Sequence, residues 1–107
     1  WLDSARDVVA KVQKKTSGNL HVYCILVGGF VKGSVYGVYI GETRYKPENR
    51  FSQHKSGIRS ARRASRFITL LPSLYRHINP LSRSEGKELE KTITGLLNDR
   101  GIRTFSG

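Results

Sequence analysis

The sequence is poor in several residue types, and these scarcities exclude whole classes of protein. Its 107 residues contain one cysteine, no methionine and three prolines. The single cysteine, Cys24, excludes a disulfide framework and a zinc site built from several cysteines. No apolar run approaches the roughly 20 residues that a membrane span requires. The length supports one domain and leaves no room for a second full core.

Acidic residues are also scarce, and they are missing altogether from one long segment. The chain has 19 Lys and Arg against 8 Asp and Glu, a formal net charge of +11. No acidic residue lies between Glu48 and Glu85, whereas eight basic residues do: Arg50, Lys55, Arg59, Arg62, Arg63, Arg66, Arg76 and Arg83. Arginine binds phosphate bidentately, so we expect an anionic polymer as partner, with a merely solvated surface as the alternative.

A membrane partner is not expected, because the residues opposite the arginines at 59–66 are mostly Ser and Ala and offer little to bury in lipid. The absence of methionine extends to the first position, which is Trp1. We therefore expect one domain over residues 1–107, excised from a longer chain, with a trimmed tag as the alternative. A helical extension is predicted over 1–18 and the core over 20–105.

Apolar spacing predicts the helices and strands of this domain. Residues 3–16 have Ala and Val at helical spacing, which predicts an amphipathic helix. Residues 20–27 and 35–41 are β-branched and aromatic, and the loop between them is too short for a helical crossover, so they should pair as an antiparallel hairpin. Proline suits the first turn of a helix over 47–56, which Gly57 would end.

The C-terminal half is less uniform. Residues 67–71 fit either the end of a helix or a third strand, and Pro72 would interrupt both. Ser82 and Glu85 form a capping box before a helix with the apolar stripe Leu89, Ile93, Leu96 and Leu97, which Gly101 would end. The predicted class is α/β (α+β), a three-stranded and mostly antiparallel sheet flanked by helices.

Four short motifs occur in a particular order along this framework. A tyrosine ends His21-Val22-Tyr23, and Tyr39-Ile40-Gly41 follows on the second strand. Nine residues after Gly41, the segment from Arg50 to His54 places Arg and His one helical turn apart. Glu90 then lies on the last helix. Together these motifs resemble the GIY-YIG nuclease superfamily over about residues 20–105, with the first signature reduced to its tyrosine.

The resemblance implies a metal-dependent endonuclease that hydrolyses phosphodiester bonds in DNA with one divalent ion. It implies catalytic roles for Tyr23, Tyr39, Arg50, His54 and Glu90. Glu90 would be the ligand of a single Mg²⁺ or Mn²⁺, an ion that prefers carboxylate oxygen. Arg50 would brace the phosphate, and His54 would act as general base or hold the phosphate. Tyr23 would orient or deprotonate water, provided that nearby positive charge lowers its pKa.

Basic residues around these motifs are the expected nucleic-acid contacts: Arg44, Lys55, Arg59, Arg62, Arg63 and Arg66. Glu88, two positions from Glu90, should be dispensable and serves as an internal control. Cys24 is expected to be an inert buried thiol. The family usually has an asparagine near its final strand, but residues 104–106 of this chain contain none. Asn98, at the end of the preceding predicted helix, could substitute for it.

Two other functions remain open at this stage. The chain can be a nucleic-acid-binding module that kept the fold and lost the chemistry. It can also be the DNase toxin domain of a larger secreted protein, acting in the cytoplasm of another cell and neutralised by an acidic inhibitor or immunity protein. We expect a monomer or weak dimer with a cytoplasmic site of action.

Overall fold

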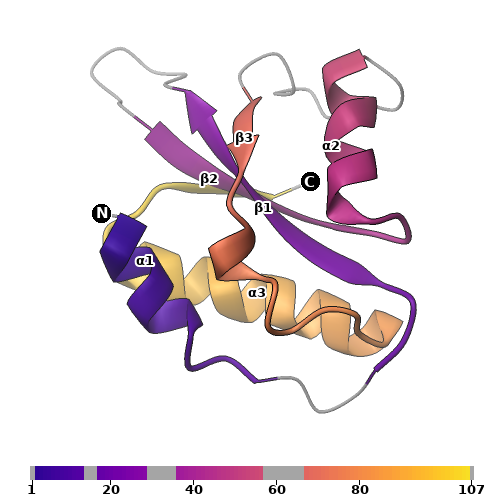
Figure 1. Ribbon diagram of the computed structural model, residues 1–107. Helices are drawn as coiled ribbons and strands as arrows, with labels where there is room; N and C mark the ends of the chain where they lie inside the picture. Colours follow the sequence, from indigo (N-terminus) through magenta and orange to yellow (C-terminus); the bar gives the residue numbers. More distant parts are fainter. Residues whose placement is uncertain (1, 14–16, 29–35, 57–66, 107) are drawn as a thin grey trace.

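The computed structural model describes residues 2–13, 17–28, 36–56 and 67–106, and in these residues four strands form one mixed sheet. The strands are β1 (His21–Gly28), β2 (Tyr36–Thr43), β3 (Phe67–Leu70) and β4 (Thr104–Ser106), in the order β3-β1-β2-β4 (Figure 1). β1 is antiparallel to both β2 and β3, whereas β4 runs parallel to β2.

The α+β class and the β1–β2 hairpin pairing are confirmed, but the prediction of three strands is wrong. The strand that sequence reasoning missed is β4, which has only three residues. Such a run is too short to show an alternating pattern, and its pairing with β2 arises from the position of the preceding helix. For residues 67–71, the strand alternative is correct, because Phe67–Leu70 pairs with β1.

Helices cover both faces of the sheet. α1 (Leu2–Val9) and α3 (Arg83–Asp99) lie on one side, and α2 (Pro47–Ser56) lies on the other (Figure 1). A short 3₁₀ helix, η2 (Pro72–Leu74), follows β3. None of the helices in the described ranges is both long and apolar enough to cross a membrane.

α1 is shorter than the helix predicted over 3–16. After Val9 the backbone tightens, since the Val12 amide donates to the Val9 carbonyl at 3.0 Å. His77 Nε2 lies 3.1 Å from both the Val9 and the Val12 carbonyl oxygens. In a longer helix these carbonyl oxygens would accept hydrogen bonds from backbone amides of the next turn. Here the His77 ring nitrogen binds them instead, which satisfies them where the helix ends. Residues 14–16 lie outside the described part.

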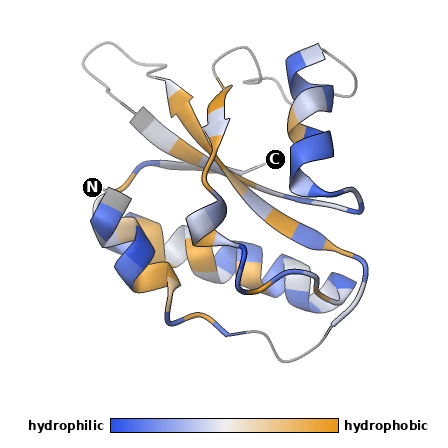
Figure 2. Cartoon of the chain, in the orientation of Figure 1, coloured by the Kyte–Doolittle hydropathy of each residue, from blue (hydrophilic) through white to orange (hydrophobic). Residues whose placement is uncertain are grey.

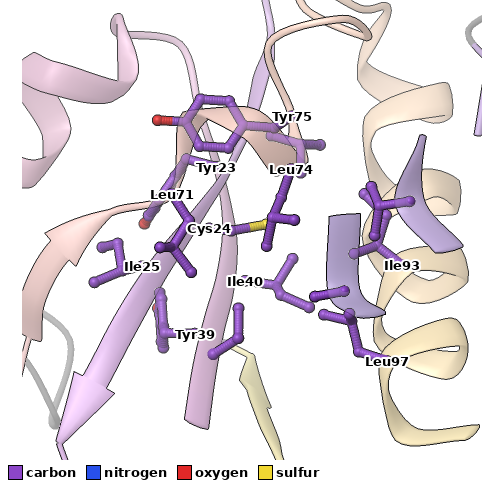
Figure 3. Packing of buried hydrophobic residues seen from close by; sticks show 14 of the residues in the cluster. Tyr23, Cys24, Ile25, Tyr39, Ile40, Leu71, Leu74, Tyr75, Ile93 and Leu97 are labelled. Carbon is purple, nitrogen blue, oxygen red and sulfur yellow. The ribbon is translucent and has the colours of Figure 1, made fainter. Parts of the chain in front are cut away.

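The face of the sheet toward α3 is the main apolar core. Cys24 and Ile40 lie on this face, and Ile93 and Leu97 of α3 are directed toward it (Figure 3). Ala5, Val8, Val9 and Val12 belong to the same buried cluster. The N-terminal segment that we predicted as an extension therefore contributes side chains to the core.

α3 begins and ends as the sequence predicts. The Ser82 hydroxyl accepts a hydrogen bond from the Glu85 amide at 3.3 Å, which is half of the predicted capping box. At the other end, Gly101 has a φ of 76°, a left-handed conformation that glycine adopts without a Cβ penalty. These two residues fix the length of the helix that carries Glu90.

The outer edge of β1 is covered along most of its length. β3 pairs with residues 25–27, and the Leu71 amide donates to the Cys24 carbonyl at 2.8 Å. Further along, the side chain of Asn79 binds both backbone groups of Val22: it accepts from the amide at 2.9 Å and donates to the carbonyl at 2.7 Å. A side-chain amide here takes the place of a neighbouring strand.

α2 differs from the other helices because it is hydrophilic on nearly all sides (Figure 2). Among its residues, only Pro47 and His54 are buried. A helix of this composition adds little to the core, so its place over the second face of the sheet depends on a few contacts, which include His54 and Lys55.

Candidate active site

Two tyrosines from adjacent strands form the centre of the candidate site. In the β1–β2 register, Tyr23 is paired with Gly41 and Ile25 with Tyr39, so both tyrosine side chains lie on the face toward α2. Their ring centroids are 6.2 Å apart, and the two residues are 2% and 4% exposed. The hairpin register thus brings together two residues that are 16 positions apart in the sequence.

Gly41 explains how the Tyr23 ring fits against the neighbouring strand. A Cβ at position 41 would lie 2.6 Å from Tyr23 Oη and 2.7 Å from its Cζ, closer than Cβ atoms in proteins approach other atoms. The glycine of the Tyr-Ile-Gly signature is therefore required by the ring on the opposite strand, and any larger residue would displace Tyr23.

His54 reaches the tyrosines from α2. Its Nε2 lies 3.0 Å from Tyr23 Oη, and its ring packs edge-on against Phe67 with centroids 5.1 Å apart. Tyr39 also contacts Phe67, at 4.9 Å between centroids. Phe67 thus supports both rings from β3, a role that sequence reasoning missed because it depends on which strand lies beside β1.

Arg50 lies one turn before His54 on α2. It donates to Gln53 Oε1 at 3.0 Å, and its charge and hydrogen bond act on Tyr23. The predicted placement of Arg50 and His54 on one helix face agrees with their common action on this tyrosine. Four of the predicted catalytic residues, Tyr23, Tyr39, Arg50 and His54, therefore lie together.

The protonation states of Tyr23 and His54 are complementary. Burial raises the pKa of Tyr23, Tyr39 raises it further, and the opposing effect of Arg50 is smaller. Positive charge, here that of Arg50, does lower this pKa as expected, but among the described residues desolvation outweighs it. Burial, and then the charge of Arg50, lower the pKa of His54 to about 4. At neutral pH the imidazole is therefore neutral and the phenol protonated, so the hydrogen bond joins two uncharged groups.

Glu90 belongs to a different group of charges. It lies on α3, which covers the opposite face of the sheet. Burial and the charge of Glu42 raise its pKa, while Lys87 and Lys91 lower it. The described contacts thus place Glu90 with Glu42 rather than with the two tyrosines.

Glu42 is a residue that sequence reasoning missed. It directly follows Gly41, and its Oε2 is buried without a hydrogen-bond partner among the residues that the structure describes. The signal in the sequence was the acidic residue next to the Tyr-Ile-Gly signature, but only the packing of β2 on α3 shows its relation to Glu90. Beyond Ile40, which pairs with Ser106, no described residue of β4 covers this end of β2.

The basic residues predicted to bind nucleic acid have different positions. Arg44 is exposed and lines a groove of about 580 Å³ together with Glu42 and Arg83. Lys55 donates to the Phe67 carbonyl at 3.0 Å, so it also ties α2 to β3. Arg59, Arg62, Arg63 and Arg66 lie outside the described residues. Tyr45, another residue not predicted, is 51% exposed beside Arg44.

The remaining predicted residues have structural surroundings. Asn98 accepts a hydrogen bond from the Thr104 hydroxyl at 2.9 Å, which links α3 to β4. Burial raises the pKa of the Cys24 thiol to about 12, so this thiol stays protonated at neutral pH. Neither arrangement requires a catalytic role.

A divalent ion, as the resemblance implies, would need oxygen ligands. Among the described residues, no group of three or more His, Cys, Asp or Glu side chains is placed to hold a metal ion. Two carboxylates, Glu90 and Glu42, nevertheless lie close enough to influence each other, and one Glu42 oxygen lacks a partner within the described ranges. Mg²⁺ is commonly held by only one or two protein carboxylates and several waters, so these residues fit such an ion.

Comparison of the chain with protein-family models, curated proteins and solved structures finds no match.

Proposed function

We propose that this protein is an endonuclease that hydrolyses phosphodiester bonds in DNA with the help of one divalent ion. The resemblance to GIY-YIG nucleases suggests the reaction. The observation that carries the proposal is the buried hydrogen bond between Tyr23 and His54, with Arg50 acting on the same hydroxyl. A purely structural core has no need to bring a phenol, an imidazole and a guanidinium together.

Proton transfer in the proposed reaction follows from this hydrogen bond. The attacking water would give a proton to Tyr23 Oη while the tyrosine passes its own proton to His54 Nε2. Neutral His54 can accept that proton in the tautomer that carries its hydrogen on Nδ1, and the high pKa of Tyr23 makes direct ionisation of the phenol unfavourable. As the water oxygen bonds to phosphorus, the bond from phosphorus to the leaving oxygen breaks.

Charge on the phosphate would be neutralised by residues on two elements. The guanidinium of Arg50 can form paired hydrogen bonds to phosphate oxygens as negative charge develops. A divalent ion held by Glu90 would, when bound, stabilise charge on the phosphate and the leaving oxygen. The end of β2 that β4 does not pair with lies between the tyrosine site and Glu90, because Gly41 is on the tyrosine face of the sheet and Glu42 is on the α3 face.

Exposed residues after β2 suit binding of the substrate. Arg44 and Lys46 are exposed cations on either side of Tyr45, whose ring is half exposed. Cations bind the phosphate backbone, and an exposed aromatic ring offers a surface on which an unpaired base can stack. This turn leads directly into α2 and therefore adjoins the proposed reaction centre.

The experiment that tests this function is cleavage of supercoiled plasmid by the purified protein in Mg²⁺, in Mn²⁺ and in chelator. Glu90→Ala is compared with Glu88→Ala, which removes an acidic residue from the same helix. We expect metal-dependent nicking that Glu90→Ala abolishes and Glu88→Ala preserves. Cleavage in chelator, or undiminished cleavage by Glu90→Ala, would contradict the proposal.

A nucleic-acid-binding module is the second candidate, favoured by the grouping of Glu90 with Glu42 rather than with Tyr23 and Arg50. This function predicts salt-sensitive binding to DNA in the absence of metal, with affinity unchanged in Glu90→Ala. No cleavage by the unmutated protein under any metal condition, together with such binding, would replace the nuclease proposal.

A further inference from the structure

One carboxylate oxygen in this protein is buried without a partner in the described part of the chain, and it faces α3. Glu42 Oε2 accepts no hydrogen bond from any described residue. It lies 3.8 Å from the point where a Cβ on Gly86 would be. Because Gly86 is one helical turn before Glu90, both are on the side of α3 that Glu42 approaches.

Burying a carboxylate oxygen without a donor is costly, and placing a second carboxylate beside it adds repulsion. The approach of Glu42 Oε2 to Gly86 brings it to the part of α3 one helical turn before Glu90, on the same side of that helix. The ammonium groups of Lys87 and Lys91 are not among the described hydrogen-bond partners of Glu42 Oε2. Some other cationic group would relieve both carboxylates at once.

We propose that Glu42 and Glu90 together form one divalent-cation site, in which Glu42 is a second carboxylate ligand contributed by the strand that carries Tyr39. The proposal deepens the nuclease function and rests on it for the role of the ion. Carboxylate oxygens are the ligands that Mg²⁺ and Mn²⁺ prefer, and two of them leave positions for water and a phosphate oxygen. The unpaired Oε2 is the feature that distinguishes Glu42 from an ordinary surface acid.

The position of Glu42 also suggests why the site lies at this end of β2. The glycine before it has no side chain, so the Tyr23 ring covers the tyrosine face at that point, and β4 pairs with β2 only up to Ile40. A cation between Glu42 and Glu90 would therefore lie at an edge of the sheet that both faces adjoin.

The test measures cation binding without nucleic acid, so that it does not depend on cleavage. Binding of Mn²⁺ to the full chain is followed by the electron paramagnetic resonance signal of free Mn²⁺. The variants are Glu42→Gln, Glu90→Gln, the double variant and the control Glu88→Gln. We expect Glu42→Gln and Glu90→Gln each to weaken binding about tenfold or more, and Glu88→Gln to leave it unchanged.

The double variant distinguishes one shared site from two separate ones. If both carboxylates hold the same ion, the double variant should weaken Mn²⁺ binding by a much smaller factor than the product of the factors measured for the two single variants. Wild-type binding by Glu42→Gln, independent effects in the double variant, or no binding by the unmutated protein would each overturn the proposal.

Thermal unfolding separates loss of a ligand from loss of the fold. Without metal, Glu42→Gln should have a Tm at or above that of the wild type, because it removes the negative charge from a partly buried side chain whose Oε2 has no described partner. Mn²⁺ should raise the Tm of the wild type and not that of Glu42→Gln. A lower Tm without metal would instead assign Glu42 a structural role and overturn the proposal.

The plasmid assay distinguishes the failure of this site from the failure of the proposed function. Metal-dependent cleavage that Glu42→Gln leaves intact would overturn the shared site and leave the nuclease standing. Mn²⁺ binding that depends on both carboxylates, without any cleavage by the wild type, would support the site and contradict the nuclease function.

Discussion

At the scale of single residues, the candidate site depends on Gly41 as much as on the tyrosines. Its missing Cβ provides the space that Tyr23 Oη occupies, and this hydroxyl is the one that binds His54. The same position thus determines packing between β1 and β2 and the hydrogen bond on which the proposed chemistry depends.

Gly41→Ala should therefore destabilise the protein, because the added methyl group would collide with the Tyr23 ring. We expect the free energy of unfolding to fall by about 1–3 kcal/mol, as for other overpacked cores. Urea denaturation measures this change.

Gly95→Ala is the matched control, because a Cβ at Gly95 would have nothing within 4 Å among the described residues. In the interior of α3, alanine should raise the free energy of unfolding by about 0.5–1 kcal/mol. A Gly41→Ala protein as stable as the wild type would show that the Tyr23 ring can move without cost.

His54 makes stability depend on pH. Burial and Arg50 lower its pKa from 6.5 to about 4, so the unfolded chain binds a proton in this interval that the folded protein does not. The stabilising contribution of neutral His54 is complete above pH 6.5 and is lost as the pH falls toward 4. In this interval His54 changes the free energy of unfolding by at most about 1.4 kcal/mol per pH unit.

Urea denaturation between about pH 4 and 7 measures this dependence in the wild type and in His54→Phe. The variant should have a shallower slope across the interval. His21, whose pKa is also lowered by burial, acts in the same direction and is present in both proteins, so the difference belongs to position 54. Equal slopes would contradict the assignment.

At the scale of elements, α3 holds Glu90 at its place, and its N-terminus depends on Ser82. The hydroxyl of Ser82 satisfies the Glu85 amide, which would otherwise be an unpaired donor at the start of the helix. Ser82→Ala should lower the free energy of unfolding by about 1 kcal/mol in urea denaturation.

Ser84→Ala is the control for this prediction, since Ser84 lies inside the first turn and is not the cap. Alanine there should leave stability unchanged or slightly higher. Equal losses in the two variants would show that the hydroxyl of Ser82 does not cap the helix.

The elements differ in how far the sequence predicted them, and the differences have physical causes. β1, β2, α2 and α3 follow from local periodicity and capping, which act over a few residues. β4 and the early end of α1 depend on distant partners, namely β2 and His77. In the site, the motifs identified Tyr23, Tyr39, Arg50 and His54. Their spacing could not predict Glu42, because only tertiary packing brings it to Glu90.

At the scale of the whole molecule, the net charge of +11 should determine how tightly nucleic acid binds. Each phosphate that a cation neutralises releases counterions, so the logarithm of affinity should fall linearly with the logarithm of salt concentration. The acid-free segment between Glu48 and Glu85 should account for most of that slope.

Two triple variants test whether the segment between Glu48 and Glu85 accounts for most of the salt dependence. Each variant removes three positive charges, one from inside that segment and the other from outside it. Changing Arg59, Arg62 and Arg63 to Gln should reduce the slope by about 0.9 for each phosphate that these arginines neutralise. Changing Lys11, Lys14 and Lys15 to Gln should reduce it much less. Fluorescence anisotropy with labelled duplex DNA over a range of salt concentrations measures both, and equal slopes would show that the charge acts without a defined footprint.

The side chain of Asn79 has a consequence for how copies of this protein behave toward one another. A strand with free amide and carbonyl groups can recruit a strand from another molecule, which is how many sheets begin to aggregate. Asn79 occupies both backbone groups of Val22, at a point on β1 that β3 does not reach. One amide side chain thus closes a position at which the sheet would otherwise be open to a second molecule, and it protects a strongly β-forming strand from misassembly.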